Sequence, residues 1–155
     1  MVEIEVPTKL YIKRYLNIKY GDPVQLTRKD LEGSFLYELI EDPRQDRNSE
    51  VGSYHHKMSV LLPDRVLMRK GFYLTPTNLS NFNSWMEKYI KSEMRRHIDL
   101  MLRQKPDLEI RDAIYDYQKQ YQLFDDFFPF DSIKKDYYRY RLRTQGDIRI
   151  RKSNT

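Results

Sequence analysis

The sequence has no cysteine, and none of its apolar runs approaches the roughly 20 residues that a membrane-spanning helix needs. Without cysteine the chain forms no disulfide framework, no thiolate zinc site and no cysteine nucleophile, as is typical of a reducing compartment. Its first residues, Met-Val-Glu-Ile-Glu-Val, also lack the basic and apolar stretches of a signal peptide. We therefore expect a cytoplasmic protein with no membrane partner.

Glycine and tryptophan are scarce as well. The five glycines are scattered, and none belongs to a Gly-rich loop of the kind that cradles phosphates, so we expect no nucleotide cofactor. Thirteen tyrosines and seven phenylalanines stand against one tryptophan, so these rings must fill much of the core and some of the surface. A chain of 155 residues is long enough to fold alone as one domain.

Positive charge is concentrated at the C-terminal end. The formal net charge is +5, and the residues from Lys134 onward hold eight bases and two acids, a net +6, which leaves −1 for the rest of the chain. A near-neutral body with a basic end predicts an anionic partner, nucleic acid first and an acidic protein or membrane surface second. The alternative is a solvated helix and tail that only aid solubility.

The N-terminal half predicts a small sheet with two helices. Residues 2–6 alternate between apolar and acidic side chains, as a half-buried strand does, and Pro7 ends them. Helices are expected near 8–20, with Gly21 just past the end, and 28–41, where Thr27 and Asp30 approximate a capping box. Residues 42–54 have the composition of an exposed loop. Short strand-like runs, which we expect to form an antiparallel sheet with the first strand, cover residues 58–62, 66–68 and 72–74.

The C-terminal half predicts three further helices. The strongest helical periodicity covers 77–104 and predicts a long central helix, which could also pair across a two-fold axis in a homodimer. Lys105-Pro106-Asp107 ends it, and Asp107 is a candidate cap for a helix that runs to about 121. Four phenylalanines between 124 and 130 are expected to plug into the core. A last helix is expected over 131–143.

Together these elements predict an α+β fold with a small antiparallel sheet, about five helices and a helix-turn-helix-like C-terminal pair. The expected organisation is a single domain over 1–143, with the pair 107–143 as a DNA-binding subregion. Residues 144–155 are expected to form a flexible basic tail, with a short strand at 148–150 as an option.

The last helix holds the candidate functional residues. Ile133, Tyr137 and Tyr140 lie at i, i+4 and i+7 and should face the previous helix, which leaves a basic outer surface with an aromatic between its charges. Lysine and arginine there can neutralise phosphates, arginine can bind guanine edges, and tyrosine can pack on sugar or base. The predicted nucleic-acid-binding residues are Lys134, Lys135, Tyr138, Arg139, Arg141, Arg143, Arg149, Arg151 and Lys152.

The layout of a helix, a connection and a basic helix is that of a helix-turn-helix reader of duplex DNA. The connection over 122–130 is longer than the usual turn of about 3–4 residues and lacks the customary glycine. A basic tail beside such a helix resembles the arms that reach into the minor groove. The alternative is that the pair packs on the central helix while its charges face water.

Candidate enzyme sites are weaker, and we predict no catalytic and no metal-binding residue. His55-His56 are adjacent on a predicted strand and therefore point to opposite faces, unlike the paired histidines of tyrosine nickases, for which Tyr137-Tyr138 would be nucleophiles. No third metal ligand is evident, and His97 falls in the central helix, where a surface or partly buried residue is expected rather than a ligand. Pro106-Asp107, Glu109 and Arg111 only partly match a Pro-Asp…Asp/Glu-x-Lys nuclease motif, because they precede a helix.

Three segments of the chain have a distinctive sequence: residues 6–16 (Val-Pro-Thr-Lys-Leu-Tyr-Ile-Lys-Arg-Tyr-Leu), 82–85 (Phe-Asn-Ser-Trp) and 134–141 (Lys-Lys-Asp-Tyr-Tyr-Arg-Tyr-Arg). Read together, they resemble a group of small proteins carried by phages and mobile elements of gut Bacteroides-type bacteria. The resemblance implies a bacterial host cell and a genome-maintenance or regulatory setting, and it identifies no catalytic residue.

The leading functional hypothesis is a non-enzymatic protein that binds duplex DNA through its C-terminal helix and tail, as a regulatory or accessory factor of a mobile element. The first alternative is an assembly or adaptor protein that binds a protein partner through exposed tyrosine and phenylalanine. The second is a small metal-dependent nuclease. Salt separates the first two, because phosphate contacts weaken steeply with ionic strength and an aromatic interface does not.

Overall fold

The computed structural model describes residues 1–40, 54–71, 73–124 and 128–153, with the backbone alone for residues 70 and 146–153. Its fold is α+β, as predicted, with a three-stranded sheet and one long helix, α4 (Pro76–Gln104). The chain divides into two compact units, residues 1–89 (unit 1) and 90–155 (unit 2), and α4 contributes to both. The single domain over 1–143 stays a prediction.

The sheet of unit 1 has the order β1-β3-β2. β1 (Val2–Thr8) runs antiparallel to β3 (His56–Leu62), as predicted. β2 (Val24–Gln25) pairs with β3 in parallel, so the expected all-antiparallel sheet is wrong and the sheet is mixed. The alternation in β3 buries Met58, Val60 and Leu62 completely, and this apolar face forms part of the core.

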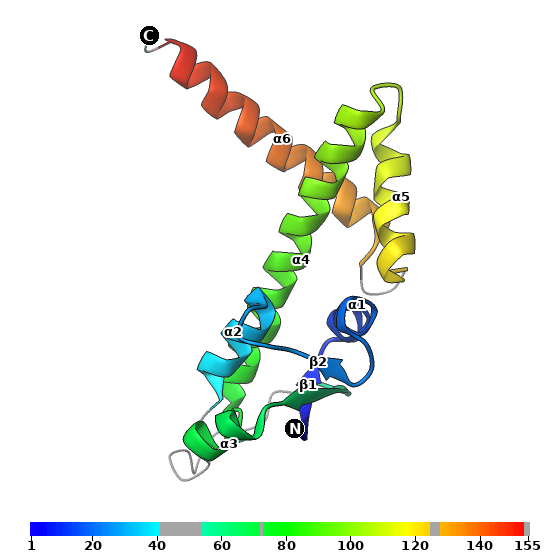
Figure 1. Cartoon of the computed structure of the whole chain (residues 1–155). Coiled ribbons are helices and arrows are strands. Elements are labelled where there is room, and N and C mark those ends of the chain that lie inside the picture. Colours follow the sequence, from blue (N-terminus) through cyan, green and yellow to red (C-terminus); the bar gives the residue numbers. More distant parts are fainter. Residues whose placement is uncertain (41–53, 72, 125–127, 154–155) are drawn as a thin grey trace. The chain divides into compact units, whose positions relative to one another are not determined.

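Three helices belong wholly to unit 1 (Figure 1): α1 (Leu10–Tyr20), α2 (Leu31–Leu39) and α3 (Asp64–Lys70). α3 shows that the strand expected at 66–68 is wrong. α2 begins three residues later than predicted, because the Asp30 carboxylate accepts hydrogen bonds from Thr27 N and Oγ1 at 2.7 and 2.8 Å, which fixes a turn before the helix. Gly21 ends α1 at φ 91°, the positive φ expected there.

The first part of α4 is fastened to both the sheet and α2. The Asn83 side chain accepts hydrogen bonds from Thr8 Oγ1 and Lys9 N at 2.8 and 3.0 Å, and donates to Pro7 O at 3.2 Å. Trp85 stacks between Phe35 of α2 and Tyr89 of α4, with centroid distances of 4.6 and 5.2 Å. The rings therefore supply much of this packing, as the aromatic composition predicts.

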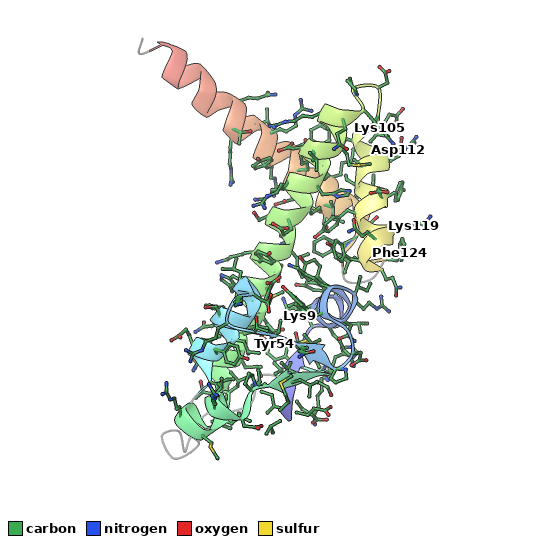
Figure 2. All side chains as sticks on the ribbon, in the orientation of Figure 1. Lys9, Tyr54, Lys105, Asp112, Lys119 and Phe124 are labelled. Carbon is green, nitrogen blue, oxygen red and sulfur yellow. The ribbon has the colours of Figure 1, made fainter. Side chains whose placement is uncertain are left out.

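Unit 2 consists of the second part of α4, α5 (Ile110–Tyr121) and α6 (Phe130–Ser153). Figure 1 shows α5 alongside α4, and α6 crossing α4 and continuing beyond both helices. Figure 2 shows Asp112 and Lys119 of α5 pointing away from α4. The core of unit 2 includes the fully buried Ile90, Met94 and Ile98 of α4.

Several predictions for unit 2 are wrong in detail. α6 continues to Ser153, so neither the predicted end at Arg143 nor the strand option at 148–150 holds, and the segment expected as a loose tail is helical to that point. Glu109 rather than Asp107 is the residue before α5. Of the four phenylalanines, Phe128 is buried as predicted, Phe124 is half exposed and Phe130 stacks on Tyr115, while Phe127 lies outside the described residues.

Candidate nucleic-acid interface

The described side chains of α6 fall into three longitudinal stripes. Residues spaced at i, i+4 and i+7 or i+8 lie on one face of a helix, so each stripe follows from the sequence spacing. The inner stripe is Ile133, Tyr137 and Tyr140; the flank stripe is Lys134, Tyr138 and Arg141; the outer stripe is Lys135, Arg139 and Arg143.

The inner stripe attaches α6 to α4. Ile133 and Tyr137 are buried, and Tyr137 and Tyr140 donate hydrogen bonds to the two carboxylate oxygens of Asp99, at 2.6 and 3.2 Å. These hydroxyls therefore bind the central helix, while α6 also packs against the previous helix α5. Burial, followed by the hydrogen bond to Asp99, raises the pKa of Tyr137 above its ordinary value, because both favour the neutral phenol.

The acid nearest the basic stripes is held by a basic residue of α4. Asp136 accepts two hydrogen bonds from Arg95, from Nε at 2.8 Å and from Nη2 at 2.7 Å. This bidentate geometry is the strong form of an arginine–carboxylate contact. The same guanidinium lies 5.4 Å from the centroid of the Tyr140 ring. Asp136 is the only acid within 134–143, and the other acids of α6 are Asp131 near its start and Asp147 near its end.

The outer stripe is exposed along its whole length. Lys135, Arg139 and Arg143 are all exposed, and among the described residues none of them forms an ion pair. Successive charges are separated by about 6 Å along the helix axis. The prediction that these bases lie on the surface is confirmed for this stripe, and the stripe presents three positive charges to solvent.

The flank stripe faces the start of α5. Lys134 and Tyr138 are exposed and Arg141 is half-buried, and all three line a hollow of about 510 Å³, here called the α5 hollow. Arg141 also lines a second hollow, of about 340 Å³, with Asp99 and Arg103 of α4. The helix face predicted as one surface is therefore divided between an open stripe and a concave site.

Sequence reasoning missed the arginines that other helices bring to this region. Arg95, Arg96 and Arg103 line a hollow of about 400 Å³ along α4, and Arg111 of α5 lines the α5 hollow. Arg95 and Asp99 each follow a buried apolar residue of α4, Met94 and Ile98. Charged residues at the border of an apolar stripe are a usable sign of partners on a neighbouring helix.

The remaining predicted residues, Arg149, Arg151 and Lys152, lie in the α6 backbone range, and their side chains lie outside the described ones. His55 is exposed, and His56 begins β3. His97 contacts Asp116 of α5 at 3.0 Å. In the described part of the chain no three His, Asp or Glu side chains are close enough to hold a metal ion.

Within the described ranges, no helix combines the length and the apolarity that crossing a membrane requires. Comparisons with protein-family models, curated proteins and solved structures found no match to this chain.

Proposed function

We propose that the protein binds duplex DNA through α6, as a regulatory or accessory factor and not as an enzyme. The observation that carries this proposal is the outer stripe: three exposed bases on one face of a helix whose neighbouring acid, Asp136, is held by Arg95. Lysine and arginine side chains that form no ion pair within the protein can take the place of the counterions around DNA phosphates. The release of these counterions drives DNA binding.

The shape of α6 also favours duplex DNA as the ligand. The major groove admits one α-helix, and within unit 2 α6 extends beyond α4 and α5 (Figure 1). Its 24 residues amount to about 36 Å. A straight helix of this kind can lie in the major groove over part of a turn while the inner stripe keeps its attachment to α4.

The charge of the two units favours the same surface. Unit 2 contains 15 Lys and Arg against 11 Asp and Glu, a net +4, whereas unit 1 contains 13 against 12, a net +1. The acids of α5, which include Asp112 and Asp116, are exposed on a different helix from the outer stripe. We infer that DNA approaches unit 2 from the side of α6.

The α5–α6 pair has the order of elements of a helix-turn-helix, but the proposal does not require that motif. The basic face of α6 is enough for a helix that lies along the groove. A phage or mobile-element setting is a further part of the proposal, and its only support is the resemblance of the three sequence segments.

Exposed aromatic and apolar side chains in unit 2 support the alternative of an adaptor protein. Tyr115 and Phe124 of unit 2 are 48% and 47% exposed, and Leu142 on α6 is 70% exposed. Exposed rings are enriched where proteins bind one another. No cluster of described residues supports a nuclease site, so we propose none.

Fluorescence anisotropy of a labelled random duplex across a salt series tests the proposal. We expect log K to fall linearly with log salt, with a slope of about −3 or steeper, since each phosphate contact contributes roughly −0.9. An excess of polyglutamate of matched charge should compete poorly. Equal competition would indicate an acidic protein partner, and absence of DNA binding at low salt would refute the proposal.

A further inference from the structure

The α5 hollow differs chemically from the outer stripe. It is lined by Lys134, Tyr138 and Arg141 of α6 and by residues from the end of α4 to the start of α5: Leu102, Pro106, Leu108, Glu109, Ile110 and Arg111. Its volume, about 510 Å³, lies in the range of small-molecule sites, roughly 300–1,000 Å³. A stripe of basic side chains alone would bind only the phosphate backbone of DNA, whereas this hollow has both positive charge and an apolar wall.

The positive charge of the hollow is supplied mainly by α6. Arg111 is held by two acids of its own segment, Glu109 at 3.2 Å and Asp112 at 3.7 Å. Lys134 and Arg141 form no ion pair among the described residues. These two cations are therefore the ones that can meet the phosphate of a ligand.

An aromatic ring lies between these two cations on the helix. Tyr138 is 44% exposed, one turn after Lys134 and one turn before Arg141. Leu102, Leu108 and Ile110 supply an apolar wall beside it. A half-exposed ring beside an apolar wall is suited to a flat apolar group, and bases stack on aromatic side chains in this way.

Two cations, an exposed aromatic ring and an apolar wall together indicate that the ligand is a nucleotide and not phosphate alone. Inorganic phosphate would gain nothing from the apolar wall, while a nucleobase can stack on Tyr138 with its phosphate at Lys134 or Arg141. The Glu109 carboxylate can accept a hydrogen bond from an exocyclic amino group of the base. A base within a duplex has both faces covered by its neighbours, so only an unpaired base can enter.

We propose that the α5 hollow holds one unpaired nucleotide at the end of a duplex, so that the protein prefers DNA with a single-stranded overhang to a blunt duplex. This inference rests on the proposed binding of duplex DNA by α6. The outer stripe then contacts the double-stranded part, and the flank stripe holds the first unpaired nucleotide.

Anisotropy titrations of three labelled duplexes test this inference. The first duplex is blunt, the second has a single-stranded overhang of about five nucleotides, and the third has an overhang of the same length that keeps the phosphates but lacks the bases. Overhangs of both polarities are measured. We expect the overhang duplex to bind about tenfold tighter than the other two, because stacking one base on an aromatic side chain is worth roughly 5- to 150-fold in affinity. Tyr138→Ala should remove the preference and Tyr138→Phe should keep it.

Tyr115→Ala is the matched control, since Tyr115 is similarly exposed but lies on α5 outside the hollow. It should leave the preference intact. Equal binding of all three duplexes by the intact protein would overturn the inference while duplex binding stands, and so would an abasic overhang as good as the natural one. If the intact protein binds none of the three, the proposed function fails together with the inference.

Discussion

Arg95 of α4 grips Asp136 of α6 with two hydrogen bonds, Nε to Oδ2 at 2.8 Å and Nη2 to Oδ1 at 2.7 Å. Both side chains are about 30% exposed, so solvent screens the pair only in part. The contact fastens the helix that carries the candidate interface, and it neutralises the one acid among the bases of residues 134–143. The Arg95–Asp136 pair therefore contributes both to the packing of α6 and to the charge of the candidate interface.

A double-mutant cycle of Arg95→Ala and Asp136→Ala should give a coupling free energy of about 1 kcal/mol, at the upper end for partly exposed pairs because the geometry is bidentate. Urea unfolding followed by circular dichroism measures it. The control cycle uses Lys57 and Glu5 of the sheet, which are 62% exposed and meet through one contact at 2.7 Å. That coupling should be smaller, and an equal or larger value would contradict the assigned role of Arg95.

Tyr137 makes the stability of unit 2 sensitive to alkaline pH. Because the folded protein raises the pKa of this phenol, its contribution is complete below the ordinary pKa of about 10 and is lost as pH rises above it. Tyr137→Phe should lower the free energy of unfolding at pH 7 by about 1.5–3 kcal/mol, the range for a hydrogen bond to a charged group. Between about pH 9 and pH 11 the variant should lose less stability than the intact protein.

Tyr115→Phe provides the comparison for this experiment, since Tyr115 is half exposed. It should leave stability at pH 7 within about 0.5 kcal/mol of the intact protein. A Tyr137→Phe protein with an unchanged alkaline profile would show that the Asp99 contact does not hold the proton on Tyr137.

Gly33 in α2 is required by the turn that precedes the helix. A Cβ at this position would overlap the carbonyl oxygen of Thr27, which is backbone and cannot rotate away. Gly33→Ala should therefore destabilise the protein by roughly 1–3 kcal/mol, the cost of overpacking, although alanine is the better helix former. Ser34→Ala is the adjacent control. Thermal unfolding measures both variants, and a rise in Tm for Gly33→Ala would contradict the packing at Thr27.

The buried carboxylate of Glu32 depends on Lys19. Glu32 is 1% exposed and accepts hydrogen bonds from Lys19 Nζ at 2.6 Å and Tyr20 OH at 2.9 Å. Burial, the largest single influence, opposes the charge on Lys19, but the hydrogen bond to Glu32 and the charge interactions with Tyr15, Glu32 and Tyr20 together outweigh it, and the pKa of Lys19 is raised. Lys19→Met should cost about 3–5 kcal/mol, because it leaves a buried charge without its cation.

The companion variant Lys19→Met with Glu32→Gln should recover a large part of that loss in urea unfolding, because the uncompensated charge is gone. If the single variant is as stable as the intact protein, the carboxylate does not depend on this lysine.

The long helix and the buried positions of α6 could be predicted because apolar spacing alone defines them. The range 77–104 lies one residue from the observed start of α4, and Ile133 and Tyr137 are buried as expected. α3 was missed because a three-residue apolar run cannot separate a strand from a helix turn. The parallel pairing of β2 was missed because two residues carry no signal about their partner.

The candidate site was predicted in part for the same reason. Spacing assigns the outer and flank stripes to the surface, which the structure confirms for Lys135, Arg139 and Lys134. It could not predict that Asp99 and Arg95, about 40 residues away in sequence, would bind Tyr137 and Asp136. Such contacts depend on how helices pack, and a periodic pattern does not encode them.

The most direct test of the central claim compares two triple variants in the duplex-binding salt series. One is Lys135→Ala, Arg139→Ala and Arg143→Ala; the other is Lys29→Ala, Arg65→Ala and Arg69→Ala, which removes the same charge from exposed positions of unit 1. We expect only the outer-stripe variant to lose affinity, with a salt slope shallower by about 2–3. Equal losses in the two variants, or none in the first, would contradict binding through α6.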